Sequence, residues 1–335
     1  MTDFISQPLP WQRAQWQRLA QQIEGERLPH ALLLAGPQGV GKRTFARALT
    51  ALLLCRSPQY GAACGACKSC LLLAAQAHPD GHWLAPEEAG NTLKGTRVIK
   101  IDQVRNLVER MVQTAQQGGR KVAVIAPAEA MNRNAANALL KTLEEPAGTA
   151  LLILISDMPG RLLPTVRSRC QRLDFPIPAH AELQAWLQPH AASADQLEQA
   201  LLEAEGRPMR ARDLLSGEEA ALRRELDEEL AAVLGRQLSV LIAAERWKQR
   251  DWTALLYWLE SRLIRALRVQ VARQPAVSPA VAQLAGASAI ALFALLDQLR
   301  ALLNQTLAGA NPNPQLALES FLFSACDAVS KNTPR

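Results

Sequence analysis

A glycine-rich loop at residues 36–42, Gly-Pro-Gln-Gly-Val-Gly-Lys, carries the clearest chemical signal in the sequence. Loops of the pattern Gly-x4-Gly-Lys-Ser/Thr wrap backbone amides around nucleotide phosphates, and the final hydroxyl binds Mg²⁺. Here Arg43 takes the hydroxyl position, and a guanidinium has no acceptor with which to bind a cation. We therefore expect a degenerate phosphate loop that binds ATP or ADP weakly or not at all. Its candidate phosphate-binding residues are Gly36, Gly39, Gly41, Lys42 and, one position late, Thr44.

The acidic residues of a nucleotide hydrolase are missing as well. In ATPases with this loop, an Asp after a later strand holds Mg²⁺, and a further polar residue positions the attacking water. The best candidate strand, residues 122–125, is followed by Ala126 and Pro127, and Glu129 comes two residues too late. Three metal- and water-handling positions are thus absent together. This predicts a non-hydrolysing subunit that works with partners.

Four cysteines within 16 residues form the second chemical signal. They follow the spacing Cys-x8-Cys-x2-Cys-x2-Cys at Cys55, Cys64, Cys67 and Cys70. Four thiolates at this spacing suit a closed, structural Zn²⁺ site, with no open position for water. An iron–sulfur cluster or four reduced thiols are the alternatives. Cys170 and Cys326 stand alone, and we expect them to be buried small residues.

Composition indicates an ordinary globular protein. The chain has 335 residues, of which 49% are hydrophobic and 20% charged. It has neither a secretory signal nor the roughly 20 consecutive apolar residues of a membrane span. We therefore expect a cytoplasmic protein without a membrane partner. The net charge of +6 comes mostly from the first 215 residues. This permits proximity to nucleic acid, so a zinc-bearing DNA-binding protein stays an alternative.

The first 175 residues alternate strand-like and helical patterns, which predicts a parallel sheet flanked by helices. Predicted strands lie at residues 31–35, 122–125, 151–155 and 171–175, and predicted helices at 42–54, 102–117 and 133–144.

Residues 176–335 show only helical patterns. Proline breaks at Pro176 and Pro178 precede about three short helices within residues 181–215, and longer helices are predicted at 252–271 and 288–303. The predicted division is therefore 1–175, 176–215 and 216–335. Three arginines at spacing three, on one predicted helix, form a basic stripe that is a solvated face, a subunit contact or a DNA contact: Arg262, Arg265 and Arg268.

Four motifs occur in one order along residues 29–170. Pro29-His30 and an apolar run precede the glycine loop, the cysteine module follows, and Asn137-Ala-Leu-Leu-Lys-Thr-Leu-Glu-Glu-Pro146 precedes Ser168-Arg169-Cys170. Together they resemble bacterial clamp-loader subunits of the AAA+ class. The resemblance implies an α/β P-loop AAA+ domain, a small helical lid domain and an all-α C-terminal collar domain that oligomerises.

The resemblance also implies a function. Clamp loaders are ATP-driven rings that open the sliding clamp and load it onto primed DNA, so the implied partners are gamma/tau and delta subunits, with clamp and DNA reached through the complex. The degenerate phosphate loop and the missing acids resemble those of a non-hydrolysing accessory subunit of a DNA polymerase holoenzyme. A catalytic gamma/tau-like ATPase and a zinc-stapled P-loop nucleotide kinase are the alternatives.

Three further residues have roles that only the resemblance implies. Arg169 would act in trans as an arginine finger on ATP bound by the neighbouring subunit. Without the resemblance, it would saturate a helix end or a surface carboxylate. Ser156 lies near the sensor-1 position, and Arg210 is a candidate for the sensor-2 arginine or a plain surface arginine.

Overall fold

The computed structural model describes most of the chain and divides it into two compact units. The first contains the described residues up to 197 together with 204–212, and the second contains 198–203 together with those from 213 onward. Described are residues 4–86, 98–117, 119–146, 148–191, 193–215, 217–273, 275–276, 278–307, 310 and 312–331, without the side chains of 195, 199 and 217–220.

A five-stranded, all-parallel sheet forms the centre of the first unit, with strand order β2-β3-β4-β1-β5. The three central strands are continuous apolar runs that are buried on both faces, as expected where helices cover both sides of a parallel sheet. The strands are β1 (Ala31–Ala35), β2 (Gly81–Leu84), β3 (Val122–Ile125), β4 (Leu151–Ser156) and β5 (Gln171–Asp174).

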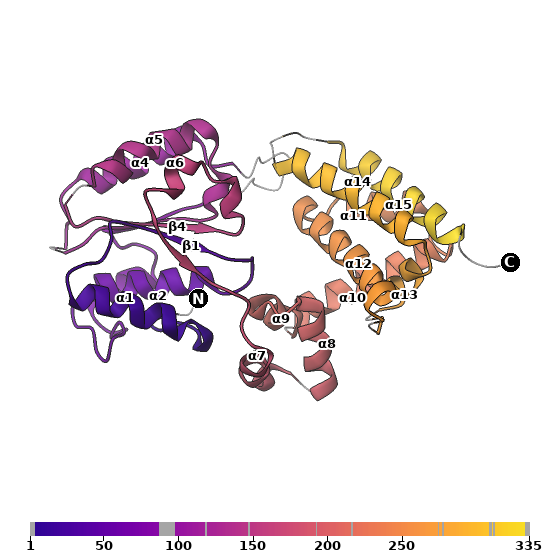
Figure 1. Ribbon diagram of the computed structural model, residues 1–335, viewed down its shortest axis with the longest axis horizontal. Coiled ribbons are helices and arrows are strands. Elements are labelled where there is room, and N and C mark those ends of the chain that lie inside the picture. The colour runs from indigo at the N-terminus through magenta and orange to yellow at the C-terminus, as the bar shows by residue number, and fades with distance from the viewer. Residues whose placement is uncertain are drawn as a thin grey trace. The chain divides into compact units, whose positions relative to one another are not determined.

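Helices cover the two faces of the sheet (Figure 1). One face carries α1 (Arg13–Glu24) and α2 (Lys42–Leu54), whose apolar residues share a core with Leu32 and Leu34. The opposite face carries α4 (Ile101–Val112), α5 (Arg133–Glu144) and α6 (Pro164–Arg167). A 3-10 helix, η1 (Pro10–Gln12), precedes α1, and α3 (Lys68–Ala74) follows the cysteine module.

The fold class predicted from the sequence is confirmed, with differences in individual elements. The helix predicted over residues 102–117 ends at Val112, so its last turn was predicted wrongly. Instead, the backbone amides of Gln116 and Gln117 donate to the Asp80 carboxylate at 2.8 and 2.9 Å. Strand β2 and helices α1 and α3 were not predicted.

The rest of the described chain is helical and contains no strand after β5. Three short helices follow the sheet, as the sequence predicts: α7 (His180–Leu187), α8 (Ala194–Ala204) and α9 (Pro208–Leu215). The second unit then contains α10 (Gly217–Leu234), α11 (Val240–Trp247), α12 (Trp252–Ala272), α13 (Pro279–Ala285), α14 (Ala289–Leu307) and α15 (Pro314–Ser330). The boundaries at 175 and 215 stay predictions.

In the described part of the chain, no single helix combines the length and apolar character of a membrane span. Helices α13 and α14 reach the threshold only when taken together, and they meet at an angle of 117°.

Two of the three arginines in the predicted basic stripe are buried. Arg262 and Arg265 on α12 are 1% and 5% exposed, so a solvated face was the wrong prediction for them. Arg262 pairs with Asp227 of α10 at 3.2 Å and with Glu203 of α8 at 3.3 Å. Its guanidinium also lies 5.8 Å from the ring centroid of Trp258. The charge of Arg262 is therefore internal and holds three helices together.

Candidate functional site

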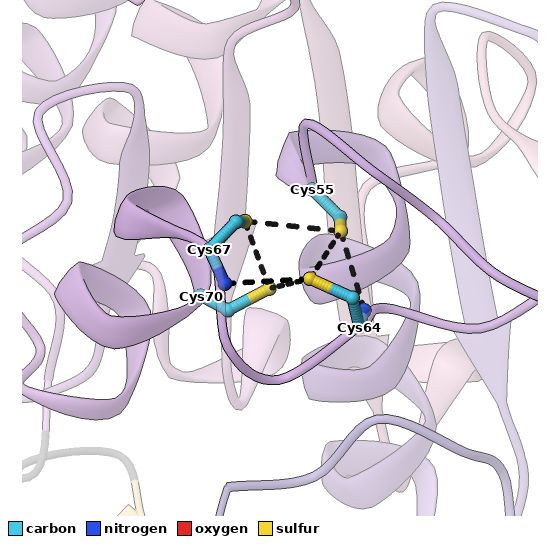
Figure 2. Close-up of side chains that lie close together, drawn as sticks. All are labelled: Cys55, Cys64, Cys67 and Cys70. Atoms are coloured by element: carbon cyan, nitrogen blue, oxygen red, sulfur yellow. Dashed lines mark hydrogen bonds between the residues drawn. The ribbon is translucent and has the colours of Figure 1, made fainter.

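The four cysteines of the module converge on one point (Figure 2). Their Sγ atoms all lie within 4.8 Å of one another, and four of the separations are 3.5, 3.6, 4.0 and 4.0 Å. Four sulfurs at about 2.3 Å from a central Zn²⁺ would be about 3.8 Å apart at tetrahedral angles. The cluster therefore has the size of a metal-thiolate site and could hold a metal ion.

Backbone amides prepare this cluster for thiolates. The amide of Cys64 donates to Cys55 Sγ at 3.3 Å, and the amide of Cys67 donates to Cys64 Sγ at 3.4 Å. Backbone donors from Ala66 and Cys67 lower the pKa of the Cys64 thiol, whereas burial raises the pKa of the Cys70 thiol. Because a metal binds thiolates, a bound cation would supply the charge that a buried Cys70 thiolate needs.

A hydrogen-bonded histidine attaches the module to the sheet domain. His78 Nδ1 accepts from the Asp80 amide at 3.1 Å, so the proton of the neutral ring resides on Nε2. That nitrogen lies 2.6 Å from Ser69 Oγ, whose hydroxyl donates to the Leu54 carbonyl at 2.5 Å. This chain of bonds connects α3 to the end of α2. His78-Pro79-Asp80 is thus a structural turn.

The lysine of the phosphate loop is occupied by the chain itself. Lys42 Nζ donates to the carbonyls of Gly36 and Pro37 at 2.6 and 2.7 Å and pairs with Asp157 Oδ1 at 2.6 Å. An ammonium has three donors, and all three are used. The Lys42 side chain is 3% exposed, and Asp157, which follows β4, supplies the negative charge.

Arg43, which stands where other loops have the Mg²⁺-binding hydroxyl, also has a partner within the chain. Arg43 Nη2 donates to the carbonyl of Ala126, directly after β3, at 3.0 Å. Glu129 is bound to backbone amides. Its Oε1 accepts from the amides of Asp157 and Met158 at 2.9 and 3.1 Å, so Glu129 holds the turn that follows β4. Arg43 and Ala126 thus supply no carboxylate for Mg²⁺, and Oε1 of Glu129 is already bound by two amides.

Two segments contact the backbone of the loop. The Gln12 side chain donates to the carbonyls of Val40 and Gly41 at 3.1 and 3.0 Å, and the Met209 amide of α9 donates to the Gly39 carbonyl at 2.9 Å. Gly41 has a φ of +89°, and a Cβ there would lie 2.4 Å from Leu9, so this contact requires glycine. The loop is therefore enclosed by η1 on one side and α9 on the other.

The remaining predicted site residues lie in two places. Thr44 is in the first turn of α2, Ser156 ends β4 with a fully buried side chain, and Arg210 of α9 lies beside Gly39. These three residues belong to the surroundings of the phosphate loop. Arg169 does not.

Arg169 contacts both a surface carboxylate and a helix carbonyl, the two partners expected for it without the resemblance. Its Nη2 pairs with Glu144 Oε1 at 2.6 Å, and its Nη1 donates to the Thr165 carbonyl of α6 at 3.0 Å. The Arg169 side chain is 36% exposed and that of Glu144 is 51% exposed. The guanidinium thus lies at the surface, held between the end of α5 and α6, and neither contact involves its own phosphate loop.

The parallel sheet, the glycine loop between β1 and α2, and the helices that follow define a protein of the AAA+ clamp-loader class. A family model described as "DNA polymerase III, delta subunit" matches residues 11–179, and one described as "DNA polymerase III, delta subunit, C terminal" matches residues 218–325. The chain belongs to the family of DNA polymerase III delta' subunits. Members of this family are accessory, non-catalytic subunits of the polymerase holoenzyme.

Three relatives carry the description "DNA polymerase III subunit delta'". That of Pseudomonas aeruginosa is 43% identical over 78% of both chains, that of Yersinia pestis 36% over 97% of both, and that of Escherichia coli 36% over 77% of this chain and 76% of its own. A gamma subunit-related protein from Thermotoga maritima shares the fold, with a TM-score of 0.50 and 19% identity, over 94% of this chain and 99% of its own.

Proposed function

We propose that this chain is the non-hydrolysing member of a clamp-loader ring, where it joins gamma/tau and delta subunits in the cytoplasm and helps to open the sliding clamp and load it onto primed DNA. The observation that carries this proposal is the self-occupied phosphate loop, in which Asp157 neutralises Lys42 and Arg43 binds the Ala126 carbonyl. A nucleotide would have to displace both contacts, and positions 43, 126 and 127 would still supply neither a hydroxyl nor an acid for Mg²⁺.

The same proposal assigns Arg169 as an arginine finger for ATP on the neighbouring subunit. Its ion pair with Glu144 is exposed to water, where such pairs contribute only about 0–1 kcal/mol. A γ-phosphate carries more charge than a carboxylate and accepts two guanidinium bonds at once. Arg169 can therefore exchange Glu144 for phosphate at small cost when a neighbour presents one.

We assign the cysteine cluster as a structural Zn²⁺ site. The sulfur separations fit a tetrahedral ion, and four protein ligands leave no position for water or substrate. The ion would fix the loop between α2 and α3 and would take no part in hydrolysis. Its ligands are Cys55, Cys64, Cys67 and Cys70.

We further propose that residues 1–175 form the AAA+ domain, residues 176–215 the lid and residues 216–335 the collar that oligomerises. Exposed apolar side chains on α14 and α15 support an association surface in the last part, because large apolar groups in water favour burial against a partner. These side chains, 54–83% exposed, are Ile290, Phe293, Leu316 and Phe323.

Reconstitution of the ring tests this proposal. The parental chain, Arg169→Ala and the control Arg167→Ala are each mixed with gamma/tau and delta subunits, and assembly, ATP hydrolysis and clamp loading are measured. Arg167 is an exposed neighbour on α6 that donates to the Pro159 carbonyl, so its removal should have little effect. Arg169→Ala should assemble normally, reduce total hydrolysis partially and reduce loading more strongly.

The partial loss is expected because only the site facing this subunit loses its finger, while an arginine finger contributes about 10³–10⁵ in rate at one site in GTPases. If Arg169→Ala loads clamps at the parental rate, Arg169 is a structural arginine. If the pure chain hydrolyses ATP at the rate of a competent AAA+ subunit, the non-hydrolysing assignment is wrong.

A further inference from the structure

A cavity of about 890 Å³ surrounds the free edge of the sheet, away from the phosphate loop. Strand β2 is the outer strand and pairs only with β3, and the cavity reaches around its open side. Residues of α2 form one wall and residues of α4 the other, while the end of α3 and the turn before β2 close one end. Figure 1 shows that α2 and α4 lie on opposite faces of the sheet.

The charges on this lining all have one sign. Three permanent cations, Arg47, Arg110 and Lys121, line the cavity, and none of its lining residues is Asp or Glu. Burial and then the charges of Arg110 and Lys121 lower the pKa of His82, in keeping with the cations on this lining. The nearby carboxylate of Asp80 is outside the lining and is occupied by two backbone amides.

Two buried polar atoms in the lining lack a hydrogen-bond partner. Thr50 on α2 is 8% exposed, and its Oγ1 is unpaired. His82 Nε2, on the strand, is buried and unpaired as well. Native proteins pair the large majority of such atoms, so each unpaired one indicates a bound group or a water. Each of the two atoms can form one hydrogen bond with a group bound in the cavity.

The strand edge offers a further donor. The Asp80 and Leu84 carbonyls accept from Val122 and Ala126 of the neighbouring segment, both at 2.9 Å, so alternate residues from 80 to 84 face β3. In a parallel strand the residues between them point the other way. The backbone amide of Trp83 therefore faces the open edge, where the cavity lies.

Arg47 is held in place by this same residue. Its guanidinium lies 5.5 Å from the centroid of the Trp83 ring, a cation–π arrangement that leaves the N–H groups around its plane available. The described residues provide no carboxylate partner for Arg47 or Arg110. The site thus combines two guanidinium groups, one ammonium, one hydroxyl and one backbone amide, and every group can donate.

We propose that this cavity binds a small polyphosphorylated molecule. Phosphate groups carry the charge that three cations require, and guanidinium pairs bind them bidentately. A cavity of about 890 Å³ lies within the range of small-molecule sites, about 300–1,000 Å³. The site shares no residue with the phosphate loop, so its occupancy can be tested separately from nucleotide binding at that loop.

Calorimetric titration of the full-length chain with inorganic tripolyphosphate, without Mg²⁺, tests this site. We expect one ion bound per chain, with an affinity that falls as salt is raised. Arg110→Gln should weaken binding at least about tenfold, since a charge-assisted hydrogen bond contributes about 1.5–3 kcal/mol. Arg105→Gln is the matched control, because Arg105 is exposed on the same helix, outside the cavity.

Arg110 is exposed, so its variant keeps the fold, which circular dichroism verifies. Lack of tripolyphosphate binding at millimolar concentration overturns the proposal, as does equal binding by Arg110→Gln and the parental chain. A 12-nucleotide single strand forms the second arm. If Arg110→Gln weakens binding of the strand and tripolyphosphate does not bind, the site is a nucleic-acid groove and the proposal is wrong.

Discussion

Arg43 donates a hydrogen bond to the backbone carbonyl of Ala126 at 3.0 Å. In a P-loop ATPase, Mg²⁺ connects the residue after the loop lysine with an acid that follows a later strand. Arg43 and Ala126 stand at these two positions, and a guanidinium forms the connection without a metal. The sequence shows the missing hydroxyl at position 43 and the missing acid at position 126 separately. In the structure, one hydrogen bond between Arg43 and Ala126 takes the place of both metal contacts.

We predict that Arg43→Thr alone does not create an ATPase. The hydroxyl would restore one metal ligand, while Ala126 and Pro127 would still supply neither an acid nor a water-positioning group. Steady-state phosphate release by the purified variant should equal that of the parental chain. Turnover comparable to a competent AAA+ subunit would show that another residue binds Mg²⁺.

Metal removal should destabilise the first unit. We expect about one Zn²⁺ per purified chain by elemental analysis, and Cys67→Ala should lose it, because thiolate ligation contributes directly to folding. The melting temperature should fall by about 5 °C or more, as expected for a loss of about 2 kcal/mol in a domain of this size. A chelator should lower the melting temperature of the parental chain and leave that of Cys67→Ala unchanged. Purified protein with neither zinc nor iron would contradict the assignment.

Arg169→Lys should be nearly as defective as Arg169→Ala in the reconstituted ring. Lysine keeps the charge but lacks the planar fork that binds two phosphate oxygens, and its ammonium ends closer to the backbone. Hydrolysis and clamp loading are the two readouts. Parental activity of the lysine variant would mean that charge alone suffices.

Loss of Arg262, one of the two buried arginines of α12, should be costly. Arg262→Ala leaves Glu203 and Asp227, 12% and 10% exposed, without their cation, and such losses cost about 3–5 kcal/mol. Denaturant unfolding measures this. Arg300→Ala removes the exposed partner of Glu260 as a control and should cost about 0–1 kcal/mol. Equal effects of the two substitutions would show that burial of the pair is irrelevant.

The histidine that attaches the cysteine module predicts a pH dependence. Burial lowers the pKa of His78 below its ordinary value of about 6.5. As the pH falls, His78 therefore binds a proton in the unfolded chain before it does so in the folded chain. The free energy of unfolding that is present above about pH 6.5 decreases as the pH falls. Melting temperatures at pH 8 and 5.5, both in chelator, should differ less in His78→Gln than in the parental chain. An unchanged difference would exclude His78 as the cause.

The central strands were predictable because burial on both faces requires an uninterrupted apolar run, as in residues 151–156. Strand β2 was not predictable, because an edge strand is only half-buried. Its sequence, Gly81-His-Trp-Leu84, shows neither an apolar run nor an alternation of apolar and polar residues. The early end of α4 depends on Asp80, whose carboxylate captures backbone amides 36 and 37 residues away. Periodicity within one segment contains no information about such a partner.

The candidate sites divide in the same way. The cysteine cluster was predictable because three of its ligands are close in sequence and the chemistry of the ligands is specific. The partner of Lys42 was not, because Asp157 lies 115 residues further along and only the pairing of β1 with β4 brings it to the loop. The sequence likewise shows three arginines on α12, but not that two of them are buried.

In the ion pair between Lys42 and Asp157, a carboxylate of the chain itself neutralises the charge of the loop lysine. A subunit that binds ATP changes shape as its triphosphate becomes a diphosphate, and so follows the energy state of the cell. This loop already carries its own anion, as a fixed carboxylate that is never hydrolysed. Under the proposed function, the geometry of this loop would not depend on the ratio of ATP to ADP.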